Sequence, residues 1–165
     1  MERKQLFRSI MDSIRSGDCE QFKITLNNHP EAVGMSTPFG TWLHVAASKG
    51  QLEIVKTLVE EFGLGVDTGD PISGGSPVHS AALEGNYSVV KYLLDRGAAL
   101  DTSEPNRNPL FGAILGGNVE IARLLISYGL DKSVSYSGAS TQETDALAFA
   151  KERGAVEFFD VLSSP

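Results

Sequence analysis

The stretch that decides the fold is residues 76–85, Ser-Pro-Val-His-Ser-Ala-Ala-Leu-Glu-Gly. It opens with Ser76, a good helix N-cap, and Pro77 follows at the first helical position, where a missing N–H costs little. Val78 and Ala81 come next, at a spacing that places both on one helix face. The closing glycine suits the left-handed position that ends many helices. The stretch therefore predicts one short, capped helix.

The same pattern recurs along the chain, which indicates an internal repeat. Each copy has a helix cap, then an aliphatic residue, then an alanine, and ends on a glycine. The caps are Thr41, Ser76, Asn108 and Asp145; the aliphatic residues are Leu43, Val78, Leu110 and Leu147; the alanines are Ala46, Ala81, Ala113 and Ala150; and the glycines are Gly50, Gly85, Gly117 and Gly154. A second apolar segment with helical spacing follows each glycine, so the unit is helix, turn, helix, loop.

Residues 41–47 and 76–82 resemble the Thr-Pro-Leu-His-x-Ala signature of the ankyrin-repeat family. The resemblance covers residues 37–162 well, and residues 3–34 fit as a degenerate first unit. It implies an all-α fold, an ankyrin-repeat solenoid of stacked helix-turn-helix units with projecting hairpin-like loops. We call these loops fingers.

The resemblance implies a single domain over residues 1–165, built from consecutive units. The expected units are an N-terminal capping unit at 3–34, repeats at 37–67, 72–101 and 104–133, and a C-terminal capping repeat at 141–163. The connection over 131–144 is long and rich in Ser and Thr, which indicates an insertion.

The net charge of −7 over 165 residues disfavours nucleic acid as a partner, because binding to phosphates needs a basic face. It favours encounter with a basic protein. Cys19 is the one cysteine, and no apolar run has the length of a signal peptide or membrane helix. We therefore expect a cytoplasmic protein with no membrane partner, monomeric when free.

The sequence offers little for catalysis. No histidine or cysteine spacing suggests a metal site, and no nucleophile or cofactor motif is visible, so an enzyme is the least favoured function and no cofactor is expected. His44 and His79 occupy one column of successive repeats. They are either a ligand or acid–base pair or, as the family implies, rings that hydrogen-bond loop backbone between repeats; we favour the second interpretation.

The resemblance implies binding on the concave side, where the fingers and the first helices meet. Leu83 and Leu115 stand in a column that faces away from the core, which favours a partner contact. With Phe39 and Trp42 they predict an apolar band, although Trp42 is equally suited to packing on the N-terminal unit. The predicted binding residues are Phe39, Trp42, Ser48, Lys49, Ile72, Ser73, Leu83, Glu84, Glu104, Arg107, Leu115, Gln142, Glu143, Glu152 and Arg153.

These observations predict a non-catalytic protein-protein interaction module that binds and inhibits or neutralises a partner. In size and acidity the chain resembles small bacterial ankyrin-type immunity proteins, which silence a cognate toxin. The alternative is a regulatory adaptor or scaffold subunit of a larger complex.

Overall fold

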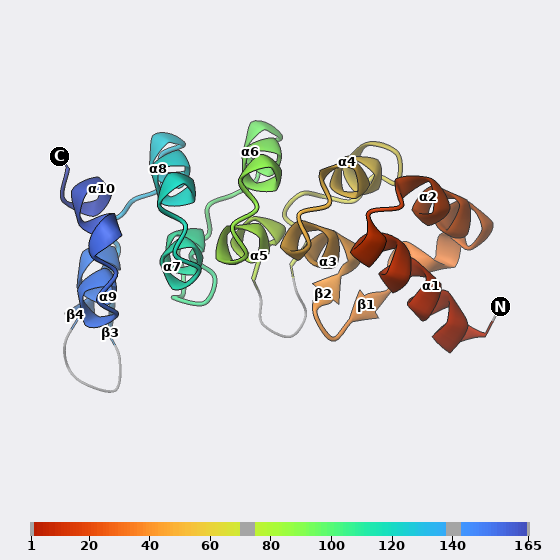
Figure 1. Ribbon diagram of the computed structural model, residues 1–165, viewed down its shortest axis with the longest axis horizontal. Helices are drawn as coiled ribbons and strands as arrows, with labels where there is room; N and C mark the ends of the chain where they lie inside the picture. Colours follow the sequence, from red (N-terminus) through yellow and green to blue (C-terminus); the bar gives the residue numbers. More distant parts are fainter. Residues whose placement is uncertain (1, 70–74, 138–142, 165) are drawn as a thin grey trace.

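The computed structural model describes residues 2–69, 75–137 and 143–164, and the helices form two rows along one axis (Figure 1). The first row holds α1 (Arg3–Ser16), α3 (Trp42–Ser48), α5 (Pro77–Leu83), α7 (Pro109–Leu115) and α9 (Ala146–Glu152). The second row holds α2 (Cys19–Asn28), α4 (Leu52–Glu60), α6 (Tyr87–Asp95), α8 (Val119–Ser127) and α10 (Phe159–Ser163). Two short 3₁₀ helices, η1 (Pro30–Ala32) and η2 (Val156–Phe158), complete the helical part.

Two fingers carry short antiparallel hairpins, which project beyond the first helices in Figure 1. Strand β1 (Ser36–Thr37) pairs with β2 (Gly40–Thr41), and β3 (Tyr136–Ser137) pairs with β4 (Glu143–Thr144). The expected helical stack with hairpin-like loops is therefore confirmed. The predicted binding residues Ile72, Ser73 and Gln142 lie outside the described residues.

The predicted helix signals act as expected. The side chains of Ser76, Asn108 and Asp145 each accept a hydrogen bond from a first-turn backbone N–H. The glycines that end the first helices have φ between +68° and +79°, a region that favours glycine. Caps and glycines thus set the length of these helices.

The core lies between the two helix rows. The aliphatic column Leu43, Val78 and Leu110 is fully buried, and so is the alanine column. In the last repeat, Leu147 is only half-buried. Small alanine side chains let successive first helices approach closely while the aliphatic residues fill the space toward the second helices.

Trp42 corrects the predicted apolar band. Its side chain is 0% exposed, its Nε1 donates a hydrogen bond to the Ala32 carbonyl at 2.8 Å, and its ring packs against Phe7 with centroids 5.3 Å apart. Trp42 therefore packs on the N-terminal unit and is not available to a partner. The indole needs a polar partner when buried, and the turn after α2 supplies it.

Asparagine side chains join successive repeats at the ends of the first helices. Asn86 Nδ2 donates to the carbonyls of Ala47 and Ser48, both at 2.8 Å. Asn118 Nδ2 donates in the same way to Ala82 and Leu83, at 3.1 and 3.4 Å. The last backbone carbonyls of a helix accept no hydrogen bond within that helix. Each asparagine therefore donates hydrogen bonds to carbonyls at the end of the first helix in the preceding repeat.

Gly116 marks the closest approach between two repeats. A Cβ atom built on Gly116 would lie 2.0 Å from the Leu83 carbonyl oxygen and 2.5 Å from Asn118 Nδ2. Backbone oxygen cannot move aside as a flexible side chain does. The observed spacing between α5 and α7 therefore requires a residue without a side chain at position 116.

We expect Gly116→Ala to lower the free energy of unfolding by about 1–3 kcal/mol, because the added methyl group forces the two repeats apart. Urea unfolding followed by circular dichroism measures this. Gly34→Ala is the matched control, since a Cβ there meets nothing within 4 Å. Equal stability of the two variants would contradict the close-approach argument.

Candidate functional site

The fingers and the first helices enclose a groove with two main hollows, which we name the finger groove. The Leu83 hollow has a volume of about 390 Å³ and is lined by Phe39, Ser48, His79, Leu83 and Glu84 among others. The Leu115 hollow, also about 390 Å³, is lined by Pro105, Leu115, Tyr136, Phe149 and Glu152 among others. Asn106 lines both hollows, so they adjoin at the third finger.

The first finger presents Phe39 to the Leu83 hollow. The Phe39 backbone N–H donates to Thr37 Oγ1 at 2.9 Å, which fixes the tip of the β1–β2 hairpin. Gly40, at φ +88°, lies so close to His44 that a Cβ would be 2.7 Å from its ring. Phe39 is 68% exposed, and it lines the same hollow as the half-buried Leu83.

A smaller hollow of about 270 Å³ extends this surface toward the N-terminal unit. Phe39, Ser48 and Glu84 line it as well, together with Lys49 and with Met11 and Arg15 from α1. Five of the predicted residues therefore lie on one continuous surface: Phe39, Ser48, Lys49, Leu83 and Glu84.

The paired histidines are structural. His44 Nε2 lies 2.9 Å from the Gly75 carbonyl oxygen, and its Nδ1 accepts the Thr41 N–H at 3.2 Å. His79 Nδ1 lies 3.2 Å from the Asn108 carbonyl oxygen. Each ring thus donates to the loop that leads into the next repeat, as the family resemblance implied. Burial lowers the pKa of His79, so the neutral ring is favoured in the folded protein.

The Leu115 hollow is walled by aromatic rings. Phe111 stacks on Phe149 with centroids 4.6 Å apart and meets Tyr136 edge-on at 5.2 Å. The Arg153 guanidinium lies 4.8 Å from the centre of the Phe149 ring. Leu115 is 45% exposed beside them. An apolar side chain entering this hollow would replace water on several apolar surfaces at once.

Tyr136 replaces a histidine in the third repeat. Phe111 stands in the histidine column and has no polar ring atom to offer the next loop. The Tyr136 hydroxyl instead donates to the Thr102 carbonyl at 2.8 Å and accepts from Asn108 Nδ2 at 3.0 Å. The β3–β4 finger is thereby tied back onto the preceding repeat.

Acidic side chains dominate the rim of the finger groove. Glu84, Glu104, Glu143 and Glu152 are all exposed. Arg107 is directed toward Asp101 and Glu104, at 3.8 Å from each, so its charge is largely balanced within its own finger. Lys49 and Arg153 are the exposed cations among the predicted residues.

The sequence missed several lining residues. Phe149 stands three positions before Glu152 on the same helix face, and the equivalent position in α5 is Ser80, which lines the Leu83 hollow. Phe149 and Ser80 both stand five positions before the glycine of their repeat. Considering this column as part of the groove would have predicted Phe149. Tyr136 had no such signal, because it lies in the long connection over 131–144, where no repeat column was identified.

The described residues hold no group of three or more His, Cys, Asp or Glu side chains arranged to bind a metal ion. Among the helices in the described ranges, none combines the length and the apolar character that crossing a membrane requires.

Comparison with known proteins gives a consistent result. Residues 10–104 match the family described as ankyrin repeats (3 copies). A putative ankyrin repeat protein of Rickettsia felis is 33% identical over 113 residues, which are 67% of this chain and 48% of that protein. Another, from Rickettsia bellii, is 32% identical over 98 residues, 58% of this chain and 25% of its own length. Protein phosphatase 1 regulatory subunit 27 of Homo sapiens is 33% identical over 94 residues, 56% of this chain and 60% of its own.

The chain thus spans about half of the Rickettsia felis protein and about a quarter of the Rickettsia bellii protein.

We expect Tyr136→Phe to lower the free energy of unfolding by about 1–3 kcal/mol, because it leaves the buried Asn108 amide without its acceptor. Urea unfolding measures the change. Tyr87→Phe is the control, since the Tyr87 side chain is 43% exposed and its hydroxyl has no hydrogen bond within the described residues. Equal loss in both variants would show that the Tyr136 hydroxyl does not tie the finger down.

The lowered pKa of His79 predicts that the free energy of unfolding falls at acidic pH. The pKa of His79 in the folded protein lies below the ordinary value of 6.5. The contribution of the neutral ring to the free energy of unfolding is therefore fully present above pH 6.5. As the pH falls toward the lowered pKa, the unfolded chain takes up the proton more readily and stability is lost. The free energy of unfolding should therefore fall more for the wild type than for His79→Gln between about pH 7.5 and 5.5. Parallel pH profiles would contradict this assignment.

Proposed function

The chain belongs to the ankyrin-repeat family, and on that premise we propose that it is a non-catalytic module that holds a partner protein in the finger groove. One observation carries the proposal: two hollows, one with the half-buried Leu83 and one with the exposed Leu115, adjoin in a single groove with an acidic rim. Exposed apolar surface inside a polar rim is typical of protein interfaces.

The groove favours a partner with a basic surface and two apolar anchor residues. Each anchor would enter one hollow, where burial of apolar area supplies most of the affinity. The exposed glutamates would meet Lys or Arg side chains at the rim, which increases the rate of encounter and selects against acidic proteins. A standard interface of about 800 Å² per partner is compatible with a surface that runs from α3 to α9.

The consequence we propose for the partner is inhibition or neutralisation, as for an immunity protein that covers a basic toxin. The acidic net charge of −7 supports this version. The second candidate is a regulatory adaptor or scaffold, and it is favoured by the likeness to a human protein named as a regulatory subunit.

The test compares proteins captured from the source cell by three baits: the wild type, Leu83→Asp/Leu115→Asp, and Ile24→Asp. Ile24 is 47% exposed on α2, in the other helix row, and controls for placing a carboxylate at an exposed apolar position outside the groove. We expect a partner that is retained by the wild type and Ile24→Asp but reduced at least about tenfold with the double variant, since a carboxylate in each hollow stays poorly solvated. Circular dichroism checks that each bait is folded.

A partner retained equally by all three baits would place binding outside the finger groove and contradict the proposal. Once the partner is identified, its activity in the presence of the chain separates the two versions. Loss of that activity indicates inhibition, and unchanged activity with recruitment of a further protein indicates an adaptor.

A further inference from the structure

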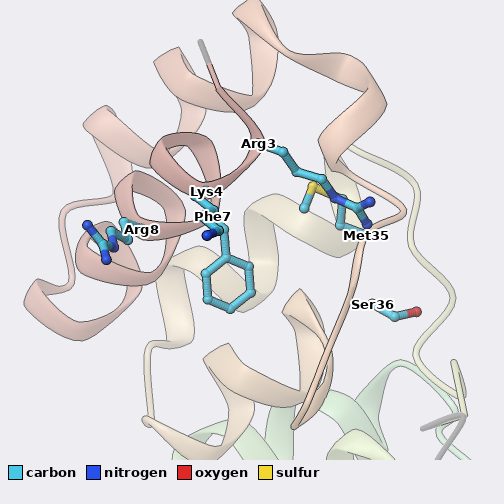
Figure 2. Close-up of a pocket in the computed structure, with 6 residues that line it drawn as sticks. All are labelled: Arg3, Lys4, Phe7, Arg8, Met35 and Ser36. Atoms are coloured by element: carbon cyan, nitrogen blue, oxygen red, sulfur yellow. The ribbon is translucent and has the colours of Figure 1, made fainter.

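A separate pocket lies at the N-terminal end of the stack. It has a volume of about 520 Å³ and is lined by Arg3, Lys4, Phe7, Arg8, Met35 and Ser36 (Figure 2). Figure 2 shows the Phe7 ring at its centre, with Arg3 extended toward Met35 on one side and Arg8 on the other. No residue of the finger groove lines it.

The floor of this pocket is apolar and held in place. Phe7 packs on the fully buried Trp42, with ring centroids 5.3 Å apart. Met35 is half-buried and packs against the core where the chain leaves the first unit for strand β1. The floor therefore offers a preformed apolar contact that needs no rearrangement of the fold, which limits the entropic cost of binding.

The rim of the pocket is basic. Arg3, Lys4 and Arg8 are exposed, and within the described ranges none of them forms an ion pair. Lys4 and Arg8 are four residues apart on α1, so they lie on one helix face, where like charges destabilise each other slightly. Glu31, the acidic residue of the adjoining hollow, already meets His29 Nδ1 at 3.1 Å. Within the described residues, therefore, none of these three cations is paired with a carboxylate, and the acidic residue that shares a hollow with Arg3 is Glu31.

We propose that this pocket binds an acidic segment of another protein, with one apolar side chain of that segment seated between Phe7 and Met35. Carboxylates flanking the apolar residue would pair with Arg3, Lys4 and Arg8. Arginine suits this role because its planar guanidinium binds a carboxylate through two hydrogen bonds.

Charge and shape favour a short protein segment over an extended polyanion. The chain carries a net charge of −7, so a membrane surface or a nucleic acid would face repulsion from the rest of the molecule. A short segment interacts only with the local cluster, because charges beyond about 8–10 Å are screened at physiological salt. The apolar floor has no use for a phosphate backbone but accommodates a side chain.

The probe is a short fluorescent peptide of Asp, Glu and Ser residues around a single Phe, and its anisotropy is measured with the full chain. We expect a dissociation constant in the micromolar range that weakens as salt is added. Arg3→Glu/Arg8→Glu should weaken binding at least about tenfold, and Arg3→Lys/Arg8→Lys, which keeps the charge but not the paired hydrogen bonds, should restore part of it. A peptide with Ala in place of Phe tests the apolar floor and should also bind more weakly.

The control variant is Lys56→Glu/Arg123→Glu, which changes the net charge equally but lies on the second helices α4 and α8. Both residues face exposed glutamates, so their loss costs little stability. We expect it to bind the peptide nearly as well as the wild type. Leu83→Asp/Leu115→Asp should also bind it fully, which separates this pocket from the proposed function of the finger groove.

Several outcomes would overturn the proposal. These are no binding of the peptide, equal weakening by the two charge-reversal variants, or binding only to vesicles containing phosphatidylserine. Self-association is another, because the C-terminal end is itself acidic and apolar, with Val156 66% exposed near Glu157 and Asp160. Light scattering that shows concentration-dependent dimers, lost in Arg3→Glu/Arg8→Glu, would assign the pocket to a second copy of the chain instead.

Discussion

The stack depends on backbone carbonyl groups that a repeat cannot satisfy within itself. Helix ends and loops leave such groups open, and a buried carbonyl without a partner is costly. Asn86 and Asn118 reach back to the helix ends of the preceding repeat, while His44 and His79 reach forward to the loop that follows. Because every one of these bonds joins two repeats, they fix the spacing and rotation of the stack, and the finger groove follows from that spacing.

The third repeat shows what happens when one of these bonds is lost. Phe111 takes the place of the histidine, and Tyr136 from the β3–β4 finger supplies hydrogen bonds instead. The exchange leaves a phenyl ring where the two preceding repeats have an imidazole. Phe149 then stacks on it, and the most apolar part of the groove results. The departure from the repeat pattern at Phe111 therefore shapes the candidate binding surface without disrupting the stack.

The sequence was sufficient for the features that are local. Caps, glycines and the two buried columns act within a few residues, so their spacing predicts the helices and their order. The candidate site was harder, because exposure depends on what packs next to a residue. Trp42 was buried by Phe7 and Ala32 of the preceding unit, and Phe149 became part of the groove through Phe111. The inter-repeat asparagines were missed for the same reason, since their partners lie in another repeat.

The distribution of charge gives the two candidate surfaces opposite preferences. The finger groove is rimmed by glutamates, whereas the pocket on α1 is rimmed by cations that form no ion pair within the described residues. In a compact domain such patches would lie within each other's field, but a solenoid spreads its surface along one axis (Figure 1). The Leu115 hollow, on α7 and α9, lies toward the opposite end of that axis from α1, and salt screens charges over such separations. The elongated stack therefore carries the acidic rim of the Leu115 hollow and the basic rim of the α1 pocket at positions where neither charge strongly affects the other.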